Sequence, residues 1–230
     1  MITIGGFIVV NWKKAIILIM LVSNILLVGC NDDKEQPEQV IFNKLENVVE
    51  LEVSFEQQQE PLLLLEEKEQ EIYEQIIQLG MKEYEQIVVL ANEAIEVVNE
   101  RKSHIEAERE SIEIAKEQFE SVKEIIEQLE SEKLREEASE LYSVMEHRYD
   151  SYDELFKYYM EAVELDLQLY ELFKNEDLTI EQLETQITTI NETYNKVKEL
   201  NDQFNEYTEQ YNDKKFTFYQ NAGLNVEYRN

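Results

Sequence analysis

Glycine and proline are scarce in this chain. Five glycines and two prolines occur among 230 residues, and Gly5, Gly6 and Gly29 all precede residue 30. A β-rich fold needs a turn about every eight to twelve residues, and turns depend on glycine, proline, asparagine and aspartate. The scarcity therefore argues against such a fold. Glutamate, lysine, glutamine, leucine and isoleucine dominate instead, a composition typical of long helices and coiled coils.

Cysteine and histidine are almost absent as well. Cys30 is the only cysteine, which excludes an intramolecular disulfide and a cysteine-based metal site. The two histidines, His104 and His147, belong to no Glu-x-x-His or HExxH pattern, because Arg101 and Val144 stand three residues before them. The sequence after residue 30 also has no glycine-rich phosphate loop. We predict no enzyme activity, no catalytic residues and no metal site, with both histidines at the surface or between helices.

Positive charge is in short supply. The chain has 21 lysines and arginines against 51 aspartates and glutamates, a formal charge of −30. Lys13 and Lys14 are the only charged residues before residue 30, so the remainder carries −32. Such a surface repels nucleic acids and anionic lipid headgroups, so we exclude nucleic acid as a partner. We interpret the acidic residues as solvated helix faces; the alternative is non-specific binding of divalent cations or of a basic partner.

The N-terminus has the pattern of an export signal. Lys13 and Lys14 precede an apolar stretch of about fourteen residues, 15–28, which is shorter than the roughly 20 residues of a membrane span. The stretch ends in Leu27, Val28, Gly29 and Cys30, which resemble a bacterial lipobox, and a polar segment follows at once. The resemblance implies cleavage before Cys30 and a diacylglyceryl lipid on its thiol. The alternative is an ordinary anchor helix with a chance cysteine.

The predicted organisation follows from this boundary. We expect a lipoprotein signal peptide at 1–29, a lipidated tether at 30–38, a helical bundle at 39–223 and a C-terminal tail at 224–230. Two or more acyl chains on one residue give durable membrane attachment. The mature protein is therefore expected to be anchored to a membrane by lipid (diacylglyceryl and palmitate-type chains) and to need no other cofactor.

Apolar residues in the body of the chain recur at helical spacing. Seven of them, each seven residues after the last, form a coiled-coil seam: Tyr84, Ala91, Val98, Ile105, Ile112, Phe119 and Ile126. A companion position three residues later is apolar too, except at Arg101 and Glu108, where the seam weakens. A helix break is expected within 131–137. Thr179 and Gln182 form a capping box that starts the last helix, and Gly223 ends it.

The number of helices depends on Gly80. If this glycine ends a helix, the chain forms four helices of about 40 to 50 residues; otherwise one very long helix and two others remain. Four near-equal helices suit an up-and-down bundle, and we favour them. Pro61 is expected to mark either a kink or a new helix start. The predicted fold class is all-α, an elongated up-and-down bundle of coiled-coil-like helices.

Thirteen tyrosines, all after residue 30, raise the question of sugar binding. Most of them lie at core spacing, where a tyrosine buries its ring and keeps its hydroxyl at the edge. Tyr158, Tyr219 and Tyr228 lie off the main stripes. These three are our candidates for surface contact.

Four distinctive stretches resemble the YkyA-type family of cell-wall-binding lipoproteins of Gram-positive bacteria. They are 55–62 (FEQQQEPL), 79–84 (LGMKEY), 145–149 (MEHRY) and 218–226 (FYQNAGLNV), and the likeness runs from about Gln36 to Val226. The resemblance implies a helical bundle fixed to the outer face of the cytoplasmic membrane and facing the cell wall. It offers no catalytic residues.

The charge constrains how such a protein meets the wall. Anionic wall polymers would repel it, so we expect contact through divalent cations or through uncharged glycan and tyrosine rings. Our leading interpretation is a lipid-anchored, non-enzymatic, wall-binding protein. The alternative is an envelope scaffold or adaptor that binds a protein partner. The sequence leaves the ligand and the oligomeric state open.

Overall fold

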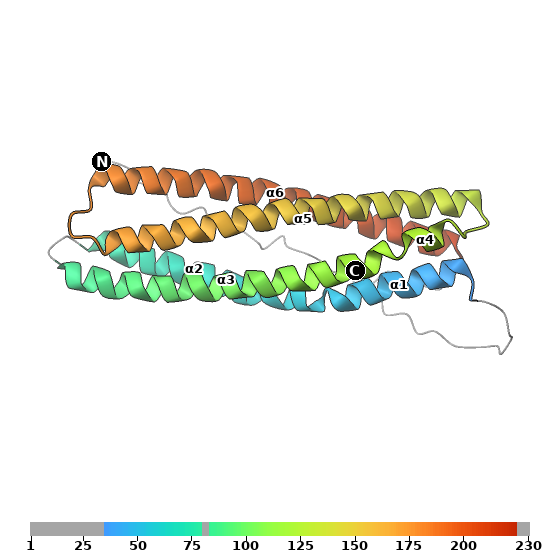
Figure 1. The fold of residues 1–230 in the computed structure, drawn as a ribbon, viewed down its shortest axis with the longest axis horizontal. Helices are drawn as coiled ribbons and strands as arrows, with labels where there is room; N and C mark the ends of the chain where they lie inside the picture. Colours follow the sequence, from blue (N-terminus) through green and yellow to red (C-terminus); the bar gives the residue numbers. More distant parts are fainter. Residues whose placement is uncertain (1–34, 80–82, 225–230) are drawn as a thin grey trace. The chain divides into compact units, whose positions relative to one another are not determined.

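The computed structural model describes residues 35–79 and 83–224. Within these two ranges every regular element is a helix and no strand occurs, which confirms the predicted all-α class (Figure 1). The helices are α1 (Pro37–Leu51), α2 (Val53–Gln78), α3 (Tyr84–Glu120), α4 (Lys123–Ile126), α5 (Glu132–Phe173) and α6 (Ile180–Asn221). None of the described helices combines the length and the apolar character needed to cross a membrane. The predicted signal peptide, Cys30 and Tyr228 lie outside the described residues.

The helices form four long segments, as predicted. Only Glu52 separates α1 from α2, and only Ser121 and Val122 separate α3 from α4. Because α2 ends at Gln78 and α3 begins at Tyr84, the alternative of one continuous helix is wrong. Gly80 itself lies outside the described residues.

These segments contribute to two compact units. Among the described residues, unit 1 contains 57–79, 83–108 and 153–202, and unit 2 contains 35–56, 109–152 and 203–224. Each unit therefore takes a stretch from all four long segments.

In unit 1, α2 and α3 run antiparallel. Gln59 of α2 donates a hydrogen bond to Glu108 of α3 (2.7 Å), and further along α2 Lys68 pairs with Glu93 (3.2 Å). The contact point thus moves backwards along α3 as it moves forwards along α2. This is the direction expected of neighbours in an up-and-down bundle.

The α5–α6 connection of unit 1 is the predicted capping box. The Gln182 amide N–H donates to the Thr179 hydroxyl (3.3 Å), and the Thr179 amide N–H donates to the Gln182 side-chain oxygen (3.0 Å). Two otherwise unpaired donors at the start of α6 are satisfied in this way. The helix start predicted at Thr179 is confirmed.

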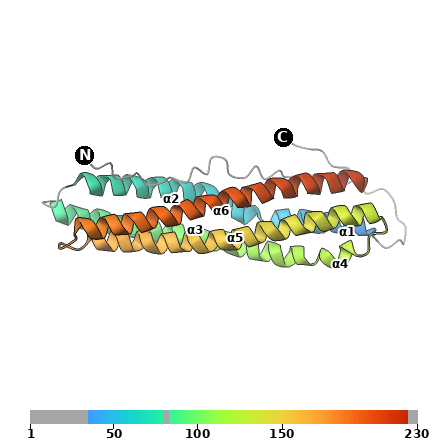
Figure 2. The ribbon, with the colours of Figure 1, turned by 90° about the horizontal axis from the view of Figure 1, so that it is seen from above.

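In unit 2, α1 lies beside α4 (Figure 2). Gly223 follows two residues after the end of α6 at Asn221. Gly223 adopts a positive φ of 72°, which glycine tolerates without a Cβ clash. The Leu224 N–H then bonds to the Tyr219 carbonyl (3.0 Å) and the Gly223 N–H to the Gln220 carbonyl (3.1 Å), a Schellman motif. The predicted stop at Gly223 is confirmed.

Two proline positions bear on where the first helices begin. α1 begins at Pro37, two residues before the predicted start of the bundle, because proline is well tolerated at the first helical position. Pro61 starts no helix: it lies inside α2, and the interruption falls nine residues earlier, at Glu52.

The predicted seam runs through α3 and ends at Ile126 of α4. Six of its seven members are buried and Tyr84 is half-buried. Arg101 and Glu108, the charged residues that weaken the companion positions, are buried as well. The weak part of the seam is thus where charged side chains are buried in the protein interior.

Candidate functional site

The Arg101 centre occupies the interior of unit 1. Arg101 of α3 donates hydrogen bonds to Glu69 of α2, to Asp166 of α5 (2.6 Å) and to the Tyr194 hydroxyl of α6 (2.7 Å). Tyr194 in turn donates to Asp166. The exposed fractions of Arg101, Glu69 and Asp166 are 3%, 2% and 0%. One guanidinium therefore joins four helices out of contact with solvent.

Carboxyl groups outnumber cations in this centre. Half-buried Glu66 lies close to Arg101 and accepts a hydrogen bond from Tyr159. Burial raises the pKa of Glu69 to about 8. The positive charge of Arg101 acts to lower this pKa, whereas the negative charge of Asp166 raises it further. Burial also raises the pKa values of Asp166 and Glu66 against the same opposing effect. A single arginine cannot compensate all three carboxylates, so the centre retains a proton at neutral pH.

The Arg148 centre of unit 2 is balanced. Arg148 of α5 binds both carboxylate oxygens of Glu52 (2.7 and 2.8 Å), and its Nε donates to the Thr208 hydroxyl of α6 (2.9 Å). Its guanidinium also lies 4.6 Å from the centre of the Phe204 ring. The two parallel bonds are the geometry in which arginine and carboxylate bind most strongly. One charge here meets one opposite charge.

Ser111 explains how Glu52 reaches the interior of unit 2. The Phe55 N–H, which would ordinarily bond to the Leu51 carbonyl, donates instead to the Ser111 hydroxyl (3.1 Å). That hydroxyl donates to the Leu51 carbonyl (2.8 Å). A side chain from α3 is thus inserted into the backbone ladder, a known cause of helix distortion. Glu52, the residue between α1 and α2, lies at this interruption.

The guanidinium groups of both arginine centres are closed off from solvent. Arg101 and Arg148 are buried, and neither of them lines the two hollows described below. In the described part of the chain, no group of three histidine, cysteine or acidic side chains could hold a metal ion. The arrangement can hold helices in register.

The most distinctive surface feature is a groove in unit 2, named here the α3–α5 groove. It has a volume of about 250 Å³ and is lined by Lys116, Phe119 and Glu120 of α3 and by Tyr142, Glu146, His147, Tyr149 and Asp150 of α5. The Phe119 and Tyr142 rings are stacked, 4.9 Å apart and inclined by 17°. All three rings of the lining are buried (Phe119 1%, Tyr142 7% and Tyr149 1% exposed), so the open part of the groove is formed by its charged and polar side chains.

Unit 1 has a hollow of a different kind. Its volume is about 500 Å³, and its lining contains no aromatic ring: Glu164, Leu167, Gln168, Glu171, Leu172, Asn175 and Gln186. It offers no flat ring to a ligand.

The predicted surface tyrosines have different fates. Tyr219 is fully buried, so the prediction of surface contact is wrong for this residue. Its ring packs 4.8 Å from that of Phe42, and its hydroxyl donates to Glu46 (2.8 Å). Tyr158 is half-buried, and the Lys157 ammonium lies 5.2 Å from its ring centre. Tyr228 lies outside the described residues, as do Leu27, Val28, Gly29 and Cys30.

The histidines lie where the sequence places them. His147 is exposed, and its ring lies 5.6 Å from that of Tyr207. His104 is half-buried between α3 and α2, where its Nδ1 is 2.7 Å from the Gln58 side-chain oxygen.

The fold and the two closed centres define a helical-bundle protein built around buried ion pairs. The chain belongs to the YkyA family, described as "putative cell-wall binding lipoprotein", which matches residues 36–221. It is 34% identical over 203 residues to the uncharacterized lipoprotein YkyA of Bacillus subtilis (strain 168), covering 88% of this chain and 90% of that relative.

A solved structure supports the fold. A conserved protein of unknown function from Staphylococcus aureus, known from its crystal structure, is similar with a TM-score of 0.57. The match covers 83% of this chain and 98% of the other, at 14% sequence identity. At that identity the likeness concerns the fold alone.

Proposed function

We propose that this protein is a lipid-anchored, extracytoplasmic protein that binds the cell wall and catalyses no reaction. The observation that carries the proposal is the family match over residues 36–221, which spans nearly all the described helices. The lipobox-like residues 27–30 directly precede this region. The family description supports binding to the cell wall. The lipobox-like residues support attachment to the membrane by a lipid.

The location follows from the proposed lipid. A diacylglyceryl group on Cys30 would hold the helices at the outer face of the cytoplasmic membrane, facing the wall. Mass spectrometry of the protein purified from a Gram-positive host should show a chain that begins at Cys30 and carries the lipid. A Cys30→Ala variant should keep its leader. An unmodified sulfur at residue 30 in the wild type would contradict the anchor.

The surface charge supports one mode of wall contact over another. At −30 the chain is repelled by anionic wall polymers unless divalent cations intervene. Uncharged glycan carries no such penalty.

Co-sedimentation with wall sacculi tests the proposal. The purified lipidated chain, in detergent micelles, should pellet with sacculi, with and without teichoic polymers, in calcium or magnesium. Micelles without protein and an unrelated acidic lipoprotein serve as controls. Absence of retention under every salt condition would refute wall binding.

A further inference from the structure

The carboxyl groups of the Arg101 centre each contact the guanidinium through one oxygen. Glu69 accepts from Arg101 with Oε2, and Asp166 accepts with Oδ2. In the Arg148 centre, by contrast, Glu52 accepts with both of its carboxylate oxygens. The second oxygen of Glu69 and that of Asp166 are therefore free of the guanidinium and can carry a proton.

All four long segments contribute titratable groups to the Arg101 centre. These groups are Glu66 and Glu69 of α2, Arg101 of α3, Tyr159, Asp166 and Tyr170 of α5, and Tyr194 of α6. Burial raises the pKa values of the three tyrosines well above their ordinary value, so their hydroxyls stay neutral. Three acids thus face one arginine, which leaves an excess of two negative charges if all three ionise.

Opening of unit 1 would remove the cost of ionising these acids. In the closed unit Glu69 and Asp166 are 2% and 0% exposed, so each carboxylate must form without water around it. Water that enters an opened unit solvates the carboxylates and screens them from one another. The pKa of Glu69, about 8 in the closed unit, then returns to its ordinary value of 4.5. The closed unit therefore holds a proton that the open unit releases between these two values.

Unit 2 has its own core and its own balanced centre. Its buried rings include Phe119 and Tyr142, stacked 4.9 Å apart, whereas unit 1 has the pair of Tyr73 and Phe173, 6.2 Å apart. Its buried arginine, Arg148, meets one carboxylate. Proteins open locally in contiguous cooperative units, and each compact unit of this chain has the separate core that such a unit requires.

We propose that the Arg101 centre is a proton-controlled switch: unit 1 is held closed by the extra proton of its buried acids and opens, separately from unit 2, as that proton is released at rising pH. The inference goes beyond wall binding and depends neither on it nor on the lipid anchor. Because opening releases one proton, each pH unit between about 4.5 and 8 should raise the open fraction of unit 1 about tenfold. Above about pH 8 the open fraction should rise no further.

Hydrogen–deuterium exchange of the full chain in detergent, followed by mass spectrometry from pH 5 to pH 8, tests the switch. Protection is expressed relative to an unstructured peptide at the same pH, which removes the base catalysis of exchange itself. Peptides that contain Arg101 or Asp166 should lose about tenfold in protection per pH unit. Peptides of unit 2 that contain Arg148 or Thr208 should keep their protection.

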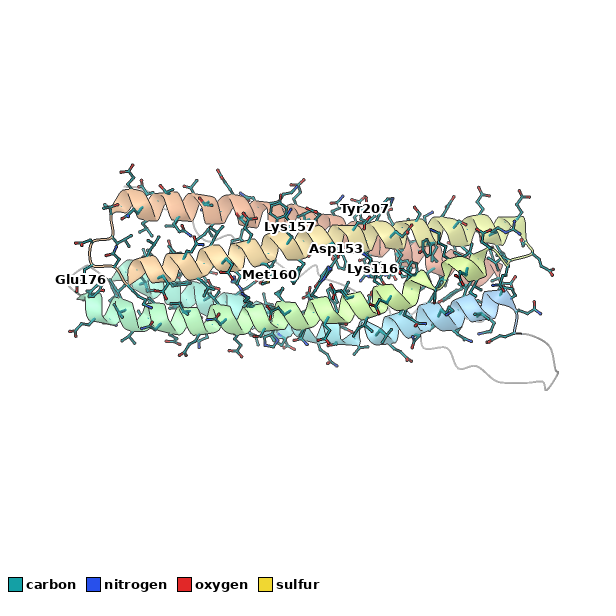
Figure 3. The ribbon with its side chains drawn as sticks, viewed as in Figure 1. Lys116, Asp153, Lys157, Met160, Glu176 and Tyr207 are labelled. Atoms are coloured by element: carbon teal, nitrogen blue, oxygen red, sulfur yellow. The ribbon has the colours of Figure 1, made fainter. Side chains whose placement is uncertain are left out.

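Glu69→Gln tests whether the proton resides in this centre. The amide keeps an oxygen that can accept from Arg101 but cannot ionise, so unit 1 should lose most of its pH dependence. Glu176→Gln is the matched control, because it removes the same charge from unit 1 at the exposed turn between α5 and α6 (Figure 3). This variant should keep the dependence of wild type, since the charges around Arg101 are unchanged.

Three outcomes would overturn the proposal. The first is constant protection of unit 1 from pH 5 to pH 8. The second is an equal loss of protection in both units, which would show that the chain opens as a whole. The third is a Glu69→Gln variant with the pH dependence of wild type. The comparison of the two units within wild type needs no variant, so it decides the matter even if Glu69→Gln does not fold.

Discussion

The two arginine centres compensate a buried positive charge in different ways. Each buries a guanidinium among helices, yet Arg148 faces one carboxylate while Arg101 faces Glu69 and Asp166, with Glu66 close by. Removing a charge from water is costly, and an opposite charge repays that cost only with good geometry. The balanced centre achieves this by bidentate pairing. The unbalanced centre achieves it by keeping a carboxyl protonated.

The excess of acid in the Arg101 centre predicts a dependence of stability on pH. Glu69 has a folded pKa of about 8 against an ordinary value of 4.5. Below about pH 4.5 the carboxyl is neutral in both states; between 4.5 and 8 only the folded state holds the proton, so stability falls as the pH rises. Above about pH 8 that contribution is lost completely. The Arg148 centre shows no such excess of acid.

The largest effect is expected from Arg148→Met. The substitution leaves Glu52 buried without its counter-charge and should lower the free energy of unfolding by about 3–5 kcal/mol in urea titrations. Lys214→Met, which removes an exposed pair with Glu140, should cost less than about 1 kcal/mol. An Arg148→Met/Glu52→Leu variant should recover most of the loss. If it does not, the loss did not come from the stranded carboxylate.

Glu69→Gln should reveal the proton in the Arg101 centre. Wild type should lose stability relative to this variant by roughly 1.4 kcal/mol per pH unit between about pH 5 and pH 8, because the variant cannot ionise. Urea unfolding at a series of pH values measures the slope. A flat difference for Glu69→Gln would show that the centre holds no extra proton.

Ser111→Ala should have a smaller effect, confined to the interruption at Glu52. Loss of the hydroxyl leaves the Leu51 carbonyl and the Phe55 N–H without their bridge, at a cost of about 1–3 kcal/mol. Ser139→Ala, which removes an exposed bond to the Arg135 carbonyl, should be nearly neutral. Faster amide exchange at Phe55 would identify the site. Unchanged exchange there would argue against the bridge.

The smallest change is expected from Lys215→Met, within about 1 kcal/mol of wild type in urea. Lys215 is buried, and burial lowers its pKa, so removing the ammonium also removes a desolvation cost. Its partner Glu46 lies 3.6 Å away, is 20% exposed and keeps the Tyr219 hydroxyl. A loss above 2 kcal/mol would make this pair resemble the Arg148 centre.

The sequence predicts the helices well because their evidence is local. Repeats of seven residues, the Thr179–Gln182 capping box and Gly223 each act within one or two helical turns. The interruption at Glu52 could not be predicted in this way. It depends on Ser111, which is 59 residues away in sequence and close only after folding.

The arginine centres are visible in the sequence as charged residues at apolar positions of the repeat. The repeat alone does not predict that these residues pair in the interior. Arg101 occupies an apolar slot of the seam, and Glu69 lies midway between buried Leu62 and Ile76 at seven-residue steps. A charged residue in an apolar slot indicates either a weak seam or a buried ion pair. Which of the two applies depends on whether an oppositely charged residue of another helix lies beside it. The prediction that Tyr219 lies at the surface was wrong for a related reason. A position off the main apolar stripe of one helix can still face a neighbouring helix.

The Arg101 centre also limits how the helices of unit 1 can slide. A shift of any one of them by a single turn would move its group by about 5.4 Å, beyond hydrogen-bonding reach of the guanidinium. Leucine contacts tolerate such a slip far better, because another leucine often follows. A helical hairpin that packs in the wrong register would therefore bury a charge without its partner. The centre thus favours the correct register of the helices in unit 1.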